Sequence, residues 1–195
     1  VKSAADKYPK NYAYEFMGKK TTYAEFMQKI DAAAKAYMAL GIQKGDRVTI
    51  CMPNCPQAVD SFYALNRIGA VSNPLSAAGE IKFYLNFSKS KAILTLDQFY
   101  GKIAPIMPEL DNPDTKLVIA KIEDELFPHL ALGYALTAGR KYPHPERKGN
   151  YIWWKEFLRK GKKLNAYLPK NAQKPEDGAS ILYSGGTTGT TKGIL

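Results

Sequence analysis

Residues 183–195 read Tyr-Ser-Gly-Gly-Thr-Thr-Gly-Thr-Thr-Lys-Gly-Ile-Leu and directly follow a short apolar run, Ala-Ser-Ile-Leu, at 179–182. The apolar run predicts a strand that opens into a loop rich in glycines and hydroxyl side chains. Gly185, Gly186 and Gly189 let the backbone turn tightly and direct successive N–H groups at one anion. The stretch therefore indicates a polyphosphate-binding loop at the end of a strand.

The remaining side chains of this loop supply hydroxyl groups and one positive charge. Lys192 provides the charge, which complements a phosphate oxygen or a departing pyrophosphate. The loop differs from that of P-loop NTPases, because Thr191 precedes the lysine and Gly193 follows it. A solvent loop rich in Gly, Thr and Ser is the simpler alternative. The candidate nucleotide-binding residues are Ser184, Gly185, Gly186, Thr187, Thr188, Gly189, Thr190, Thr191 and Lys192.

Upstream of the loop, strand patterns alternate with helix patterns. Thr22 and Glu25 form a capping box, and apolar residues then recur at helical spacing up to Gly41. Strands are expected at 47–52, 70–72, 92–95 and 117–120, with Pro74 ending the second, and Asp97 is expected to cap a helix. This alternation predicts an α/β fold, with a mainly parallel sheet flanked by helices on both faces.

At the loop, the chain resembles the adenylate-forming superfamily, the acyl-CoA synthetases and their relatives. The usual pattern of that superfamily is Tyr-Thr-Ser-Gly-Thr-Thr-Gly-x-Pro-Lys-Gly. Tyr183, Gly186, Thr187, Thr188, Gly189, Lys192 and Gly193 match it, whereas Gly185 replaces Ser and Thr191 replaces Pro. The resemblance covers most of the chain, since residues 39–48 and 66–75 look like earlier blocks of these enzymes, and we interpret those blocks as scaffold.

The resemblance implies a two-step reaction in the large N-terminal domain of an adenylate-forming enzyme. A carboxylic acid and ATP give an acyl-adenylate and pyrophosphate, and CoA then displaces AMP. Lys192 is implied as the catalytic charge, and Ser184 as a Mg²⁺ ligand, with Thr187 as second choice. The segment 126–170 most resembles that of fatty acyl-CoA ligases, which implies a fatty acid, with the long-chain type as the finer expectation; aryl or amino-acid ligases are alternatives.

The chain begins at Val1 and reaches only to Leu195, so we expect a piece of a longer protein. The other site residues of the family would follow Leu195. We therefore expect the 195 residues alone to catalyse nothing.

The net charge of +10 is concentrated in one segment. Residues 126–170 hold ten Lys and Arg against Glu146 and Glu156, which accounts for +8 of the total. Trp153 and Phe157 are expected on one face of a helix there, with lysines around the other face. Such a helix usually docks on its own core, although peripheral contact with an anionic membrane is possible.

The remaining features limit the class of protein. A nucleic-acid partner is not expected, although a nucleic-acid or membrane module is the rival to an enzyme. No run approaches the ~20 apolar residues of a membrane span. Cys51 and Cys55 have no neighbouring His and indicate core thiols in a reducing cytoplasm. Three segments are predicted: an α/β subdomain at 1–125, the basic aromatic insert at 126–170, and the strand and loop at 171–195.

Overall fold

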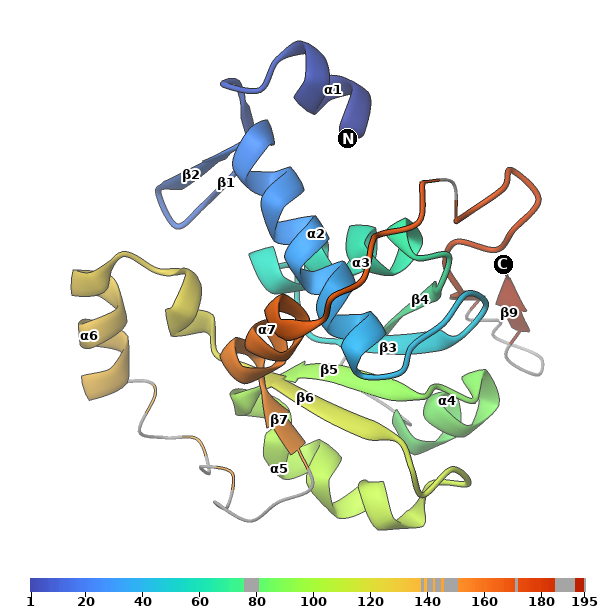
Figure 1. The fold of residues 1–195 in the computed structure, drawn as a ribbon. Coiled ribbons are helices and arrows are strands. Elements are labelled where there is room, and N and C mark those ends of the chain that lie inside the picture. The colour runs from blue at the N-terminus through green and yellow to red at the C-terminus, as the bar shows by residue number, and fades with distance from the viewer. Residues whose placement is uncertain are drawn as a thin grey trace.

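The computed structural model describes all residues except 76–80, 138, 140–141, 143–144, 146–150, 171, 185–191 and 195. The chain starts with a short helix, α1 (Lys2–Lys7), and a β-hairpin of β1 (Tyr12–Phe16) and β2 (Lys19–Thr22). At the hairpin turn, Gly18 has a φ of 81°. The hairpin leads directly into the long helix α2 (Figure 1).

Helix α2 (Tyr23–Ala39) begins and ends as predicted. The Thr22 N–H donates to Glu25 Oε2 at 2.8 Å, and the Glu25 N–H donates back to Thr22 Oγ1 at 3.3 Å. This reciprocal pairing satisfies backbone donors that the first helical turn cannot pair internally. After the helix, Gly41 adopts a φ of 89°, a left-handed conformation that residues with a Cβ rarely adopt.

Five parallel strands form the central sheet, in the order β4-β3-β5-β6-β7. Helices connect successive strands, so the predicted α/β class with a mainly parallel sheet is confirmed. The strands are β3 (Arg47–Cys51), β4 (Val71–Leu75), β5 (Ala92–Leu96), β6 (Lys116–Ala120) and β7 (Tyr151–Trp153).

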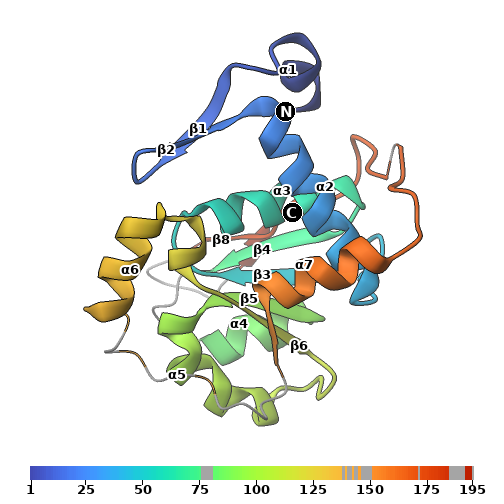
Figure 2. The same ribbon diagram turned by 60° about the vertical axis from the view of Figure 1, so that its left-hand side comes forward.

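Helices cover both faces of this sheet (Figures 1 and 2). On one face, α2, α3 (Pro56–Arg67) and α7 (Trp154–Lys163) enclose a core that includes Val48, Leu94 and Val118. On the other, α4 (Ile81–Ser88) and α5 (Tyr100–Ile103) pack on Ile93 and Ile119. Short 3₁₀ turns also occur at η1 (Asp97–Phe99), η2 (Ala104–Glu109) and η3 (Ile122–Glu125), and Ile122 of η3 packs on the core beneath α2, α3 and α7.

The segment after β6 departs from the sheet and then returns to it. Helix α6 (Pro128–Leu136) projects from the side of the molecule and has no buried residue (Figure 2). The chain then adds β7 to the sheet, and α7 packs across α2. At that crossing Gly161 meets Ala36 so closely that a Cβ at position 161 would lie 2.5 Å from the Ala36 nitrogen. The division of the chain at residues 125 and 170 stays a prediction.

Three local expectations were wrong. Trp153 belongs to strand β7, and the helix begins one residue later, with Trp154 and Phe157 buried. Asp97 opens the 3₁₀ turn η1 and does not cap α5, because its side chain accepts from the adjacent Gln98 N–H at 2.9 Å. Pro74 lies within β4 at the edge of the five-stranded sheet, and does not end the strand. Residues two apart on a strand direct their backbone groups to the same side, and the N–H and carbonyl of Ser72 face away from β3. An N–H at position 74 would also face away from β3, so proline at this position costs no hydrogen bond to β3.

Candidate functional site

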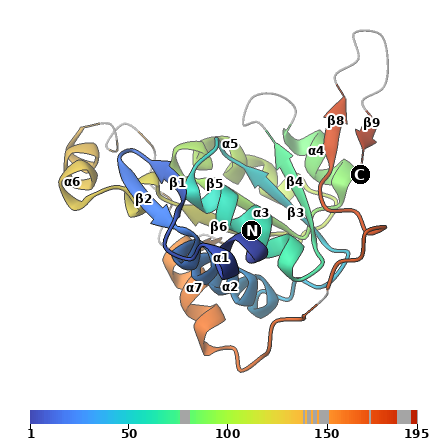
Figure 3. The same cartoon turned by 90° about the horizontal axis from the view of Figure 1, so that it is seen from above.

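The predicted loop is held between two short antiparallel strands, β8 (Leu182–Ser184) and β9 (Lys192–Ile194). Ser184 is opposite Lys192, Tyr183 opposite Gly193, and Leu182 opposite Ile194. The pairing brings the backbones of Ser184 and Lys192 together at the mouth of the loop (Figure 3). The other predicted phosphate-binding residues, 185–191, lie outside the described residues, so their contacts stay predictions, as do the side-chain roles of Ser184 and Lys192.

The segment before β8 is attached to the edge strand of the sheet. The Ser72 N–H donates to the Ala179 carbonyl at 3.1 Å, and the Ile181 N–H donates to the Ser72 carbonyl at 2.9 Å. These bonds form a parallel bridge between Ser72 and Ser180. Residues 179–181 therefore run parallel to β4, and the stem that follows them lies at the carboxyl end of the sheet. Open α/β folds bind ligands at that end.

Aromatic packing against α4 fixes the other side of this stem. The Tyr183 ring centroid lies 4.4 Å from that of Tyr84 and 6.2 Å from that of Phe87. A Cβ at Gly193 would lie 3.1 Å from Phe87 Cε1 and 3.3 Å from Ile181 Cγ2. Glycine at 193 thus lets β9 lie close to both side chains, which is a packing reason for the Lys-Gly pair.

A chain of buried polar side chains lies beneath Tyr183. Asn73 Nδ2 donates to Thr49 Oγ1 at 2.8 Å, Thr49 Oγ1 is 2.7 Å from Ser90 Oγ, and Ser90 Oγ is 2.8 Å from Ser88 Oγ. Burial raises the pKa of Tyr183, and the nearby Asn73 and Ser88 partly offset that rise. The polar chain therefore lies next to the loop stem and extends to the middle of the sheet, although the Tyr183 hydroxyl itself has no hydrogen-bond partner among the described residues.

Sequence reasoning treated Asn73 only as scaffold. The available signal was a polar residue within an otherwise apolar strand, since Asn73 is completely buried. A buried amide needs partners, and among the described residues its Nδ2 finds one in Thr49 of β3, which in turn contacts Ser90 in the turn after α4. Only the arrangement of three strands side by side shows which residues they are.

The described residues hold no group of three or more His, Cys, Asp or Glu side chains arranged to bind a metal. Cys51 and Cys55 are free, buried thiols. Burial raises the pKa of Cys51 to about 11, so this thiol stays protonated near neutral pH.

The basic segment is only partly engaged with the rest of the molecule. In α7, Lys155 pairs with Asp124 at 2.7 Å, while Lys160 pairs with Glu156 at 3.7 Å. In α6, by contrast, Leu132 and Leu136 are 62% and 53% exposed. Among the described helices, none combines the length and apolar character needed to cross a bilayer.

A doubly covered parallel sheet, with a Gly/Thr-rich loop held at the carboxyl end of its edge strand, defines a nucleotide-binding α/β protein. The chain belongs to the AMP-binding enzyme family, whose model matches residues 1–195. The recognition of an adenylate-forming enzyme from the loop sequence is thereby confirmed.

Its relatives include two kinds of acyl-CoA ligase. The chain is 32% identical over 197 residues to the long-chain-fatty-acid–CoA ligase of Bacillus subtilis. This alignment covers 98% of this chain and 34% of that protein. It is 31% identical over 186 residues to an acetyl-coenzyme A synthetase of Streptomyces avermitilis, covering 89% of this chain and 25% of the relative. The chain thus spans 34% and 25% of the length of these relatives.

Solved structures share the fold. The N-terminal domain of FACL13 from Mycobacterium tuberculosis matches 99% of this chain with a TM-score of 0.67 and 21% identity, over 41% of its own length. A fatty acyl CoA synthetase of the same organism matches 99% of this chain with a TM-score of 0.68 and 21% identity, over 32% of its length.

Proposed function

We propose that the protein activates a carboxylic acid with ATP and transfers the acyl group to CoA. A carboxylate oxygen attacks the α-phosphorus of ATP, the bond to the bridging oxygen breaks, and pyrophosphate leaves. The CoA thiol, losing its proton, then attacks the acyl carbon of the acyl-adenylate, and AMP leaves. The observation that carries this proposal is the family match together with the β8–β9 stem, which brackets the loop sequence at the carboxyl end of the sheet.

The loop's part in this reaction is electrostatic. Negative charge builds on the β- and γ-phosphates as pyrophosphate departs, and preorganised N–H groups and a cation stabilise that charge. We assign the cation to Lys192 and the N–H groups to the glycine-rich residues 185–191. The backbone pairing of Ser184 with Lys192 supports this assignment, because it holds both ends of the loop at one place.

Mg²⁺ is compatible with the oxygen donors of this region. An ion that shares the phosphates of ATP keeps several waters and needs few protein oxygens. We propose the Ser184 hydroxyl as one such oxygen, with Thr187 as second choice. When bound, Mg²⁺ would neutralise charge on the phosphates; binding of the adenylate and of CoA would rest on further residues of the protein.

We propose a fatty acid, of long-chain type, as the substrate. The Bacillus subtilis relative, a long-chain-fatty-acid–CoA ligase, supports this choice, whereas the acetyl-CoA synthetases among the relatives favour a short acid. We further propose a cytoplasmic location, in keeping with two buried free thiols.

The test is acid-dependent exchange of labelled pyrophosphate into ATP by the full-length protein, followed by acyl-CoA formation. Acetate, octanoate, palmitate, benzoate and an amino acid would be compared at equal concentration. Fastest exchange with palmitate supports the proposal. Preference for acetate, benzoate or the amino acid would refute the fatty-acid assignment, and no exchange with any acid would refute acid activation.

Helix α6 favours a second proposal, peripheral contact with an anionic membrane. Its leucines are exposed, and it lies within the segment that carries +8. Apolar residues beside basic ones are typical of surfaces that dock on anionic lipid. Such contact would bring the enzyme to the phase that holds long-chain fatty acids.

A further inference from the structure

A cavity of about 460 Å³ lies between the β1–β2 hairpin, α2, α3, η3 and α7. This volume is within the range of small-molecule sites and far exceeds the roughly 30 Å³ that one water occupies. The cavity lies over the α7 side of the sheet, whereas the β8–β9 stem extends from the β4 edge (Figures 1 and 3). It is therefore separate from the nucleotide site proposed above.

The floor of the cavity is acidic. Lys29 Nζ lies 2.7 Å from Glu125 Oε2 but 4.0 Å from Asp60 Oδ2, and it also donates to Tyr14 Oη at 3.2 Å. The Asp60 side chain is only 4% exposed, and its Oδ1 has no hydrogen-bond partner among the described residues. One ammonium thus serves two carboxylates, and a buried acceptor is left without a donor.

This charge imbalance changes the pKa of the Asp60 carboxyl. Burial raises the pKa of Asp60 to about 7, and the charge of Glu125 adds to that rise, while Lys29 and the neighbouring Tyr14 hydroxyl oppose it. A buried carboxylate with too few donors is unfavourable, so a donor placed beside the Asp60 carboxylate would be stabilised. A positively charged donor would also restore the balance of charge at the floor.

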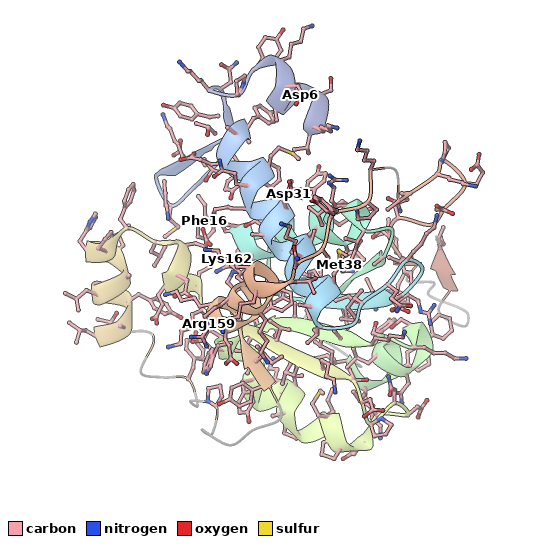
Figure 4. All side chains as sticks on the ribbon, in the orientation of Figure 1. Asp6, Phe16, Asp31, Met38, Arg159 and Lys162 are labelled. Carbon is pink, nitrogen blue, oxygen red and sulfur yellow. The ribbon has the colours of Figure 1, made fainter. Side chains whose placement is uncertain are left out.

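The rim of the cavity has the opposite charge. Three lysines, Lys19, Lys20 and Lys162, line it against one carboxylate, Glu25, and none of the three forms an ion pair within 4.0 Å in the described part of the chain. Lys162 lies on α7 (Figure 4) and lines the cavity together with Lys19 and Lys20 of the hairpin. Trp154 and Leu158 provide an apolar wall between rim and floor.

We propose that this cavity binds a small organic zwitterion, with its ammonium group at the floor carboxylates of Asp60 and Glu125 and its anionic group at the lysine rim. A simple cation would have to pass three lysines, and a simple anion would face two carboxylates at the floor. A zwitterion with a short apolar body matches floor, wall and rim together.

The test uses three probes of one length, 6-aminohexanoate, hexanoate and hexylamine, titrated by calorimetry into the full-length protein. We expect 6-aminohexanoate to bind about tenfold or more tightly than either single-charge probe, because each lacks one charge-assisted contact. The Asp60→Asn variant should lose this preference, whereas the Asp111→Asn control, on the far side of the sheet, should keep it. Equal binding by Asp60→Asn, equal binding of hexanoate, or no binding of 6-aminohexanoate would each overturn the proposal.

A second measurement needs no variant and covers the case in which Asp60→Asn fails to fold. An ammonium group beside Asp60 favours the ionised carboxylate, so binding near pH 6.5 should release a proton. Calorimetry in buffers of different ionisation enthalpy measures that release. Binding without proton release would refute contact with Asp60. Neither measurement depends on acyl-CoA formation, so both are independent of the function proposed above.

Discussion

At the scale of single residues, the charge of Lys192 is the simplest feature to remove. We expect Lys192→Ala to lower acid-dependent pyrophosphate exchange by roughly 10²- to 10³-fold, as for loss of one group that stabilises transition-state charge. Lys82→Ala is the matched control, because Lys82 pairs with Glu109 at 2.8 Å on the exposed surface. An unchanged rate in Lys192→Ala would remove the loop lysine from the mechanism.

Asn73 offers a test of how the buried polar chain positions the loop stem. Asn73→Leu removes the amide that donates to Thr49, and we expect KM for ATP to rise severalfold with KM for the acid unchanged. Thr115→Val removes a buried hydroxyl that donates to the Asn112 carbonyl and is the control for lost stability alone. Parallel changes in both KM values would indicate a general structural effect.

Asp60 makes folding stability depend on pH. The pKa of this carboxyl is raised to about 7 in the folded protein, above its unfolded value of 3.8. Between these values the folded state holds a proton that the unfolded state has lost, so this group's contribution falls as pH rises from 4 to 7. Asp60→Asn removes the dependence, and we expect it to gain up to about 4 kcal/mol relative to wild type between pH 4 and pH 8. Urea unfolding at both pH values measures this; a pH-independent difference would contradict the assignment.

At the scale of elements, the crossing of α7 over α2 depends on a missing side chain. A methyl group at position 161 would lie 2.5 Å from the Ala36 backbone, which cannot move without shifting α2. We expect Gly161→Ala to destabilise the protein by about 2 kcal/mol, despite the better helix propensity of alanine. Gly133→Ala in α6, where no atom lies within 4 Å of the added Cβ, should be neutral or stabilising. Thermal unfolding distinguishes the two, and equal melting temperatures would contradict close packing.

The exposed face of α6 is the element on which membrane contact depends. Replacing Leu132 and Leu136 together by Ser should lower sedimentation with anionic vesicles by at least about tenfold, because both side chains would lose burial in lipid. Met17→Ser, which changes an exposed apolar residue of the β1–β2 turn, should have no effect. Binding that persists in the double variant, or that ignores salt, would exclude this mode of contact.

At the scale of the whole molecule, the chain covers 34% of the length of its Bacillus subtilis relative. We expect the 195 residues by themselves to bind ATP with a Kd weaker than about 1 mM, because phosphate contacts alone leave the adenine solvated. Calorimetry with ATP and GTP, followed by an assay with CoA and palmitate, measures this. Tight, adenine-selective binding or acyl-CoA formation would place the complete site within these residues.

Local rules in the sequence were sufficient for much of the fold. The Thr22–Glu25 capping box and the Gly41 stop depend on neighbouring residues only, and both were predictable. Trp153 was misassigned because a strand of three residues, Tyr151–Trp153, is too short to show its own periodicity next to a helix. The family of the loop was evident from its glycines and Lys192.

Features that join distant parts of the chain were not predictable. Lys29 and Glu125 are 96 residues apart, and nothing in either neighbourhood indicates that they share a cavity with Asp60. The Asn73–Thr49–Ser90 chain likewise depends on the order β4-β3-β5, which differs from the order along the sequence. Periodicity assigns residues to elements, but the contacts between elements depend on how the sheet is assembled.

We expect the two backbone hydrogen bonds between Ser72 and residues 179–181 to protect the molecule against self-association as well. They occupy an edge of β4 that would otherwise expose an unpaired N–H and carbonyl, a template on which a strand of another molecule can add. A version truncated at residue 170 should therefore form oligomers at concentrations where the 195-residue chain stays monomeric, which light scattering would detect. In this protein the segment that leads to the predicted phosphate loop would then also prevent strand addition at the edge of the sheet.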